Sequence, residues 1–352
     1  MMSLFAQLQE QVGAAYVVER ELKAGGSARL FLAREPTLDR QVVIKVLPPE
    51  LTVKVDAVRF RREIQLAAKL QHPHLVPVLA AAPPPDETAA ADAVLEQLLW
   101  FSMPYIEGEN LREWIDRREL LLTHDVVRLM RELASGLAYA HARGVVHRDI
   151  KPDNVLLREG IAMLSDFGIA KALVDASTDA HRAGSRVTTR STQLGTPSYM
   201  APEQITSPQS VDHRADIYAF GCLAYELLTG ASPFANRSLR ATLAAHVHER
   251  PVDVGQHRRD IPPALADIVM RCLAKDPSMR PHSATWIVRA IDNVPNGAQT
   301  ATPEAAVSAA ARASSVPVIT PPEGGFSVGP RDAVIAAAAS AVVALVLWLT
   351  LF

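Results

Sequence analysis

Three short motifs occur in a fixed order in the middle of the chain, and they constrain its fold more than any other feature. The first runs from His147 to Asn154 (HRDIKPDN), the second is Asp166-Phe167-Gly168, and the third is Ala201-Pro202-Glu203. A single tripeptide of this kind arises easily by chance, whereas three in this order with compatible spacings form a specific combination. A chain that carries all three is therefore expected to adopt one particular fold.

The three motifs resemble the signature of the protein kinases, in which H-R-D is followed by Asn, D-F-G and A-P-E. The resemblance covers about residues 16–294 and is nearest to the bacterial transmembrane serine/threonine kinases of the eukaryotic-like (Hanks) type. It implies an α+β, bilobal protein-kinase-like fold. A small β-rich N-lobe with one main helix is expected over about residues 16–103, and a larger α-helical C-lobe over about residues 107–294.

Hydrophobic periodicity in the same region gives a compatible picture. Short β-like runs and one helical stretch come first, and helical patterns dominate afterwards. The β-like runs are residues 30–33, 41–47 and 75–79, and the early helix is 56–70. The later helices are predicted at 111–118, 124–142, 212–229, 263–274 and 284–292. The low-complexity stretch 80–92 is predicted to be a surface loop.

The two ends of the chain lie outside this body. Residues 1–15 form an N-terminal segment, and residues 295–332, rich in Pro, Ala and Ser, predict a disordered, flexible linker. Residues 333–352 are 20 consecutive positions without a charge. About 20 helical residues cross the hydrocarbon layer of a bilayer, so a C-terminal transmembrane helix is expected. Arg331, just before it, agrees with a single-pass anchor in the cell membrane that leaves the kinase domain cytoplasmic.

Charge and cysteine content exclude several functional classes. The chain has 36 Lys and Arg against 38 Asp and Glu, a formal net charge of −2, which lacks the basic excess of a nucleic-acid-binding protein. Its two cysteines, Cys222 and Cys272, are 50 positions apart. They form neither a disulfide framework nor a thiolate zinc site, and they are predicted to be small buried hydrophobic residues.

The resemblance implies a role for each polar residue of the motifs. Asp149 would orient the attacking hydroxyl, and Lys151 would lie over the γ-phosphate. Asn154 and Asp166 would bind Mg²⁺ or Mn²⁺, hard ions that prefer oxygen ligands. The implied cofactors are ATP and Mg²⁺.

Upstream residues would complete the nucleotide site. Lys45 ends a β-branched run and would contact the α- and β-phosphates while pairing with Glu63 on the next helix. The glycine-rich loop keeps only Gly25 of the three glycines of its usual pattern, with Lys23 and Ala28 at the other two positions, which puts the rate of catalysis in doubt. Gly25 and Gly26 can still form the tip of the loop. The remaining nucleotide contacts implied by the resemblance are Leu22, Leu30, Met103 and the Ile106 N–H.

Further residues are implied to regulate or stabilise the domain. Thr192 is the expected activating phosphosite, with Thr188 and Thr189 as alternates, and Arg148 and Lys171 would bind the phosphate. Glu203, Asp216 and Arg280 are expected to be structural, with Glu203 paired to Arg280.

Three functions remain open at this point. The first is a non-specific serine/threonine protein kinase that acts on protein substrates and is activated by trans-autophosphorylation in a homodimer at the lipid bilayer. The second is a membrane-anchored pseudokinase scaffold, favoured only by the eroded glycine loop. The third is a small-molecule kinase of the aminoglycoside type, disfavoured by Arg148, Lys151 and the A-P-E motif.

Overall fold

The computed structural model describes residues 2–23, 28–47, 57–84, 98–117, 121–167 and 197–294. The chain divides into two compact units, residues 1–296 and 297–352, and every described residue lies in the first. The predicted linker (295–332) and the predicted membrane helix (333–352) lie outside the described residues. Among the helices in the described ranges, none is long and apolar enough to span a bilayer.

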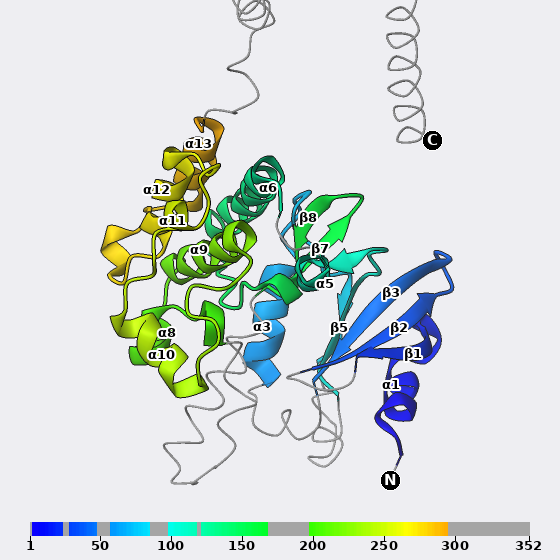
Figure 1. Cartoon of the computed structure of the whole chain (residues 1–352). Helices are drawn as coiled ribbons and strands as arrows, with labels where there is room; N and C mark the ends of the chain where they lie inside the picture. The colour runs from blue at the N-terminus through cyan, green and yellow to red at the C-terminus, as the bar shows by residue number, and fades with distance from the viewer. Residues whose placement is uncertain are drawn as a thin grey trace, which may run out of the picture. The chain divides into compact units, whose positions relative to one another are not determined.

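The N-lobe is built on a five-stranded antiparallel sheet in the order β1-β2-β3-β5-β4, of which Figure 1 labels β1, β2, β3 and β5. β2 and β3 pair along their full length, from Arg29 opposite Val46 to Glu35 opposite Arg40. The strands are β1 (Val17–Lys23), β2 (Arg29–Glu35), β3 (Arg40–Val46), β4 (Ala80–Ala81) and β5 (Trp100–Pro104).

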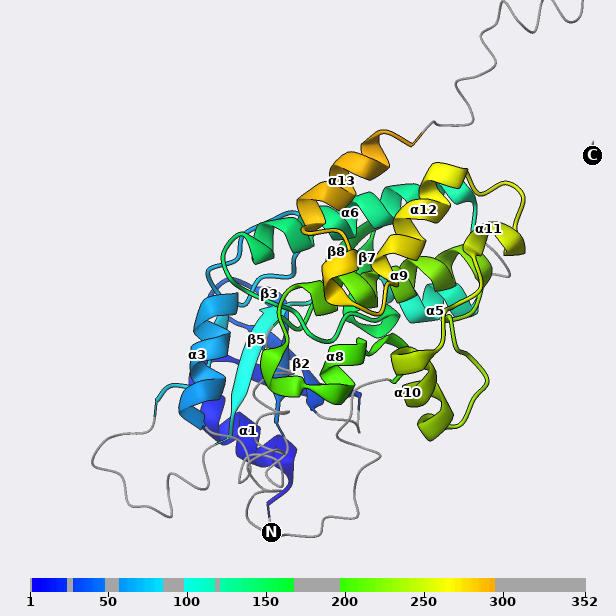
Figure 2. The ribbon, with the colours of Figure 1, turned by 90° about the vertical axis from the view of Figure 1, so that its left-hand side faces the viewer.

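Side chains alternate across this sheet, as the period of two in a strand requires. Ile44 and Val46 of β3 pack on the face covered by helix α1 (Leu4–Val12). Val43 packs on the opposite face, with Phe60 and Ile64 of helix α3 (Ala57–Ala67). The sheet therefore lies between two helices, and its α3 face looks toward the C-lobe (Figures 1 and 2).

The C-lobe is mainly helical and is centred on α9 (Arg214–Thr229), in which every residue from Ala215 to Leu228 is buried. A three-stranded sheet in the order β6-β7-β8 (Glu109–Asn110, Val155–Arg158, Ile161–Leu164) lies beside α6 (Thr123–His141). The other helices are α5 (Leu111–Asp116), α8 (Pro202–Thr206), α10 (Leu239–His248), α11 (Val254–His257), α12 (Pro263–Cys272) and α13 (Ala284–Asp292). Short 3-10 helices are η1 (Gly13–Ala15), η2 (Pro152–Asn154), η3 (Pro197–Tyr199), η4 (Pro208–Ser210) and η5 (Pro277–Met279).

Two backbone connections join the lobes within the described residues. The chain crosses once, through residues 105–108 after β5. The second connection is a backbone pairing: the Val76 N–H donates to the Leu164 carbonyl (2.8 Å), and the Leu164 N–H donates to the His74 carbonyl (2.9 Å). Residues 74–76, which belong to the N-lobe in sequence, are therefore bonded to β8 of the C-lobe.

The bilobal α+β prediction is confirmed, and each predicted helix of the body is present. Cys222 and Cys272 are fully buried, as expected. The predicted strand at 75–79 is wrong, because this segment first bonds to β8 and reaches the N-lobe sheet only at its end, where the Leu79 N–H donates to the Ser102 carbonyl (2.8 Å) just before Ala80–Ala81. That short strand also replaces the first two residues of the loop predicted at 80–92.

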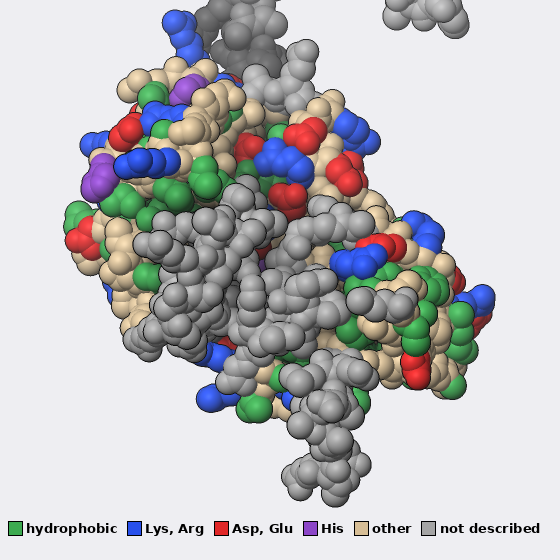
Figure 3. All heavy atoms as spheres, turned by 90° about the horizontal axis from the view of Figure 1, so that it is seen from below, with side chains coloured by type: hydrophobic (Ala, Val, Ile, Leu, Met, Phe, Trp, Pro, Cys, Tyr) green, Lys and Arg blue, Asp and Glu red, His purple; other side chains and the backbone are tan. Residues whose placement is uncertain are grey.

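Charged side chains of both signs are interspersed over the face seen from below (Figure 3). Blue and red groups lie next to one another there, rather than separating into single-sign patches. This distribution agrees with the near-balanced charge of the whole chain.

Candidate active site

The loop between α6 and β7 folds its own polar side chains around Asp149. The Lys151 ammonium lies 2.7 Å from Asp149 Oδ2. The Asn154 side-chain amide donates to the same Oδ2 (3.0 Å) and to the Asp149 backbone carbonyl (2.7 Å). The carboxylate is therefore fixed by two side chains from the five residues that follow it.

Asp216 on α9 fixes the backbone of this loop through hydrogen bonds. Its carboxylate is fully buried and accepts the backbone N–H of His147 (2.8 Å) and of Arg148 (2.7 Å). Nε2 of His141 lies 2.8 Å from the same carboxylate. Arg148 has a φ of 69°, a conformation that a non-glycine residue adopts only when its surroundings stabilise it. The two hydrogen bonds to Asp216 supply that stabilisation.

The same contacts set the protonation of Asp216. Burial alone raises the pKa of a carboxyl group. Here the hydrogen bond and the electrostatic attraction of His141 outweigh burial and hold the pKa of Asp216 below its ordinary value. The side chain is therefore ionised at neutral pH and accepts both backbone bonds.

Lys45 and Asp166 meet across the two lobes. Lys45 lies on β3 opposite Phe101 of β5, on the sheet face turned toward the C-lobe, and its Nζ is 2.8 Å from Asp166 Oδ2. Burial raises the pKa of Asp166, but attraction and a hydrogen bond from Lys45 outweigh it, and the pKa is lowered overall. The pair thus places one cation and one anion at the lobe boundary.

Packing of the next residue fixes Asp166. Phe167 is buried against the His147 ring, with ring centroids 4.5 Å apart, and it lines a pocket with Ala67 of α3 and Met103 of β5. The His147 Nε2 lies 2.7 Å from the Ser165 carbonyl. Asp166 itself has a φ of 67°, so its strained backbone is held from both sides.

The oxygen atoms left at this site fit a hard divalent cation. Asp166 Oδ1 is buried and has no hydrogen-bond partner among the described residues. The side-chain nitrogen of Asn154 donates both of its hydrogen bonds to Asp149. The side-chain oxygen is therefore the atom of Asn154 that can bind a cation. No cluster of three or more His, Cys, Asp or Glu side chains suited to a metal occurs in the described ranges. Two protein oxygens suit Mg²⁺, which keeps waters and substrate phosphate oxygens in its shell.

Several predicted nucleotide contacts gather on the α3 side of the N-lobe sheet. Met103 is buried there, and Leu22 and Leu30 pack, half-buried, against the same cluster. Glu63 lies half-buried on α3, and its pairing with Lys45 stays a prediction. Ile106 lies in the connection between the lobes. Gly25, Gly26, Lys171, Thr188, Thr189 and Thr192 lie outside the described residues.

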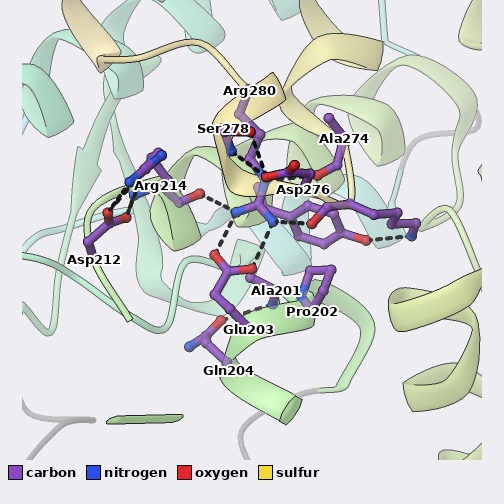
Figure 4. Close-up of polar contacts among 12 residues, drawn as sticks. Ala201, Pro202, Glu203, Gln204, Asp212, Arg214, Ala274, Asp276, Ser278 and Arg280 are labelled. Atoms are coloured by element: carbon purple, nitrogen blue, oxygen red, sulfur yellow. Dashed lines mark hydrogen bonds and ion pairs between the residues drawn. The ribbon is translucent and has the colours of Figure 1, made fainter. Parts of the chain in front are cut away.

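Glu203 and Arg280 form a bidentate pair that fastens α8 to the base of the C-lobe (Figure 4). The two guanidinium nitrogens lie 2.6 and 2.7 Å from the carboxylate oxygens, and the Arg280 side chain is fully buried. Arg280 also donates to the backbone carbonyls of Ala274, Arg214 and Lys275. The A-P-E motif is thereby tied to α9 and to the segment before η5.

Sequence reasoning missed a second buried network next to this motif. The Tyr199 hydroxyl accepts from Arg112 of α5 (2.6 Å) and donates to Glu226 of α9, while Arg112 also bonds Glu226 (2.9 Å). Burial raises the pKa of Tyr199, and the Glu226 carboxylate raises it further. The available signal was Glu226, a lone acid in the apolar run 217–228 of a predicted helix, where a charge needs a partner.

Comparisons with known proteins agree with this geometry. A family model described as "Protein kinase domain" matches residues 16–290. The chain is 36% identical over 277 residues to the serine/threonine-protein kinase pkn3 of Myxococcus xanthus, covering 76% of this chain and 48% of that protein. It is 37% identical over 281 residues to the serine/threonine-protein kinase PknJ of Mycobacterium tuberculosis, covering 78% and 44%.

A solved structure gives the same result for the fold. The PknI kinase domain of Mycobacterium tuberculosis superimposes with a TM-score of 0.59 and 29% sequence identity, covering 79% of this chain and 96% of that domain. The chain spans less than half the length of the two curated relatives named above.

Proposed function

This chain belongs to the protein kinase family, and on that premise we propose that it transfers the γ-phosphoryl group of ATP to serine and threonine hydroxyls of proteins. The observation that carries the proposal is the convergence of Asp149, Lys151 and Asn154 with the Lys45–Asp166 pair. Phosphoryl transfer depends mainly on positioning and charge stabilisation, and these side chains supply both.

Each residue has a role that follows from its contacts. Asp149, held by Lys151 and Asn154, orients the substrate hydroxyl and accepts its proton. Lys45, at 2.8 Å from Asp166, stabilises the α- and β-phosphates. Asn154 and Asp166 would hold Mg²⁺ through the oxygens described above. When bound, Mg²⁺ neutralises charge on the transferred phosphoryl group.

The choice of serine and threonine rests on two supports. Lys151, two residues after Asp149, follows the serine/threonine pattern of the family rather than the tyrosine pattern. The curated relatives also carry serine/threonine-protein kinase names.

Labelled ATP tests the activity directly. The full chain, purified in mild detergent, is incubated with labelled ATP, Mg²⁺ and a protein substrate, beside an Asp166→Asn variant prepared in the same way. Label in the parent and none in the variant supports a working kinase. A folded parent that transfers no label contradicts the proposal and favours a scaffold.

Regulation by the segment 168–196 is part of the proposal. Thr192, with Thr188 and Thr189 as alternates, would be phosphorylated in trans by a second copy. Arg148, the expected phosphate partner, donates from its side chain to the Val211 carbonyl (3.3 Å). Phosphosite mapping on active protein is expected to find modification in 168–196. Activity without any modification there would refute this part.

Membrane attachment by residues 333–352 is also proposed, with the kinase domain on the cytoplasmic side, where ATP is available. The support is the uncharged run of 20 residues. The full chain is expected in the membrane fraction, and a variant without residues 333–352 in the soluble fraction. Full-length protein in the soluble fraction without detergent would contradict attachment.

A further inference from the structure

The helix α1 precedes the part of the chain that matches the kinase family, yet it is built into the N-lobe core. The family match begins at residue 16, and α1 runs from Leu4 to Val12 with Ser3 as its N-cap. Leu8 is fully buried and Val12 is 5% exposed. Both belong to the cluster on the sheet face opposite α3.

Two glutamines tie α1 to the sheet backbone. The side chain of Gln9 accepts the Val18 N–H (2.8 Å) of the edge strand β1 and donates to the Tyr16 carbonyl (3.0 Å) just before that strand. The side chain of Gln11 accepts the Leu98 N–H (2.9 Å) just before β5. The segment thus contacts both the first strand and the approach to the strand that leads out of the lobe.

Tyr16, directly after η1, extends this contact into β5. Its hydroxyl is 3.2 Å from the Ser102 hydroxyl, and both side chains are buried. Its ring packs edge-on against Trp100, with centroids 6.1 Å apart. A buried hydroxyl without a partner costs free energy, so the Tyr16–Ser102 pair adds to the backbone bonds that β5 makes with β3 and β4 and helps to fix the position of β5.

The side chains on the two faces of β5 have different neighbours. Trp100 and Ser102 point toward α1 and Tyr16, whereas Phe101 and Met103 point toward Phe167 and the α3 side. β5 ends at Pro104 and continues into the connection that contains Ile106. A shift of β5 therefore moves Met103 and the following backbone, the predicted contacts of the adenine ring.

We propose that Tyr16, held by α1, is a positioning residue for nucleotide binding that acts through Ser102 and β5. The inference rests on the proposed function. Asp149 lies in the other lobe and is held by Lys151, Asn154 and the Asp216-bound loop. Loss of the Tyr16 hydroxyl therefore weakens nucleotide binding and leaves the chemical step unchanged.

The test compares two matched Tyr→Phe variants of the full chain. Tyr16→Phe is expected to raise the KM for Mg²⁺-ATP and the Kd for a fluorescent N-methylanthraniloyl ATP three- to tenfold, with kcat within twofold. Tyr225→Phe is the control, because it removes a buried hydroxyl that contacts His257 in the C-lobe (2.8 Å). It should lower stability and leave KM and Kd unchanged. If Tyr16→Phe had the same KM and the same Kd as Tyr225→Phe, the inference would be overturned.

A second pair of variants separates positioning from general loss of structure. Ser102→Ala alone should weaken nucleotide binding in the same direction, because it leaves the Tyr16 hydroxyl unpaired. The double variant Tyr16→Phe/Ser102→Ala should lose no more affinity than the more weakly binding of the two single variants, because each single change already removes the hydrogen bond. Additive losses in the double variant would refute action through this pair.

The two measurements also distinguish this inference from the proposed function. Kd for the fluorescent nucleotide needs no phosphoryl transfer. A parent that binds nucleotide but transfers no phosphate contradicts the proposed function, and the Kd comparison still decides the role of Tyr16. A parent that transfers phosphate while Tyr16→Phe behaves like Tyr225→Phe overturns only the positioning role.

Discussion

At the scale of single residues, buried charges in this protein are fixed by several partners at once. Arg280 makes five hydrogen bonds, two of them to Glu203. Such a pair adds little stability compared with apolar residues packed in its place. Removing one partner is costly, however, because it leaves a buried charge unpaired. Removing one partner of a buried pair should therefore cost much more stability than removing one partner of a surface pair of the same type.

Variants at Arg280 and at a surface arginine test this difference in stability. Arg280→Ala is expected to lower the free energy of unfolding by about 3–5 kcal/mol, as measured by urea denaturation. Arg237→Ala is the control, because Arg237 forms a similar pair with Glu249 (2.7 Å) on the surface. The control should cost at most about 1 kcal/mol. Similar losses in both variants would contradict the structural role of the Glu203–Arg280 pair.

His246 makes stability depend on pH. It is fully buried beside Tyr218, and burial lowers its pKa to about 4, against about 6.5 in the unfolded chain. The unfolded state binds the proton first as pH falls, so stability decreases between about pH 6.5 and 4. His246→Gln should flatten this decrease by about 2 kcal/mol across the window.

Urea titrations at several pH values check the expectation for His246. The exposed His248→Gln, two residues along the same helix, serves as the control and should keep the parent slope. An unchanged slope in His246→Gln would show that other groups carry the pH dependence.

At the scale of elements, close helix packing overrides local propensity. α9 and α12 approach so closely that a Cβ on Gly221 would lie 2.7 Å from the Cys272 Cβ and 3.2 Å from Leu273. Alanine is the better helix former by about 1 kcal/mol, but here it would push the two helices apart.

Gly221→Ala is therefore expected to lower the free energy of unfolding by about 1–3 kcal/mol, measured by urea denaturation. The reason is steric overlap in the centre of the C-lobe rather than lost contacts. A gain in stability would mean that α9 and α12 separate without cost.

Sequence patterns predicted the long helices and the motif loops, because a wide apolar stripe and short-range polar contacts are local properties. α9 and the loop from His147 to Asn154 are examples. The strand expected at 75–79 failed because its partner, Leu164, is distant in sequence. The role of α1 was missed for the same reason. Its Gln11 bonds the Leu98 N–H, and its apolar side chains share a cluster with Trp100, and both partners come far later in the chain. The Lys45–Asp166 contact also depends on the arrangement of two lobes, which no local pattern specifies.

At the scale of the whole molecule, residues 1–296 behave as one compact unit. We therefore expect the two lobes to unfold together. Far-UV circular dichroism, dominated by the C-lobe helices, and the fluorescence of Trp100 in the N-lobe, isolated by Trp114→Phe/Trp286→Phe/Trp348→Phe, should give coincident urea midpoints. An earlier fluorescence transition would show that the N-lobe unfolds alone.

The backbone pairing of residues 74–76 with β8 limits how the lobes move. A rigid body fixed to another at two separate points keeps one rotational freedom, about the line through those points. Here the points are this pairing and the connection at 105–108. Rotation about this line is the motion that leaves both connections intact, and the distance between Lys45 and Asp166, 2.8 Å here, changes with it.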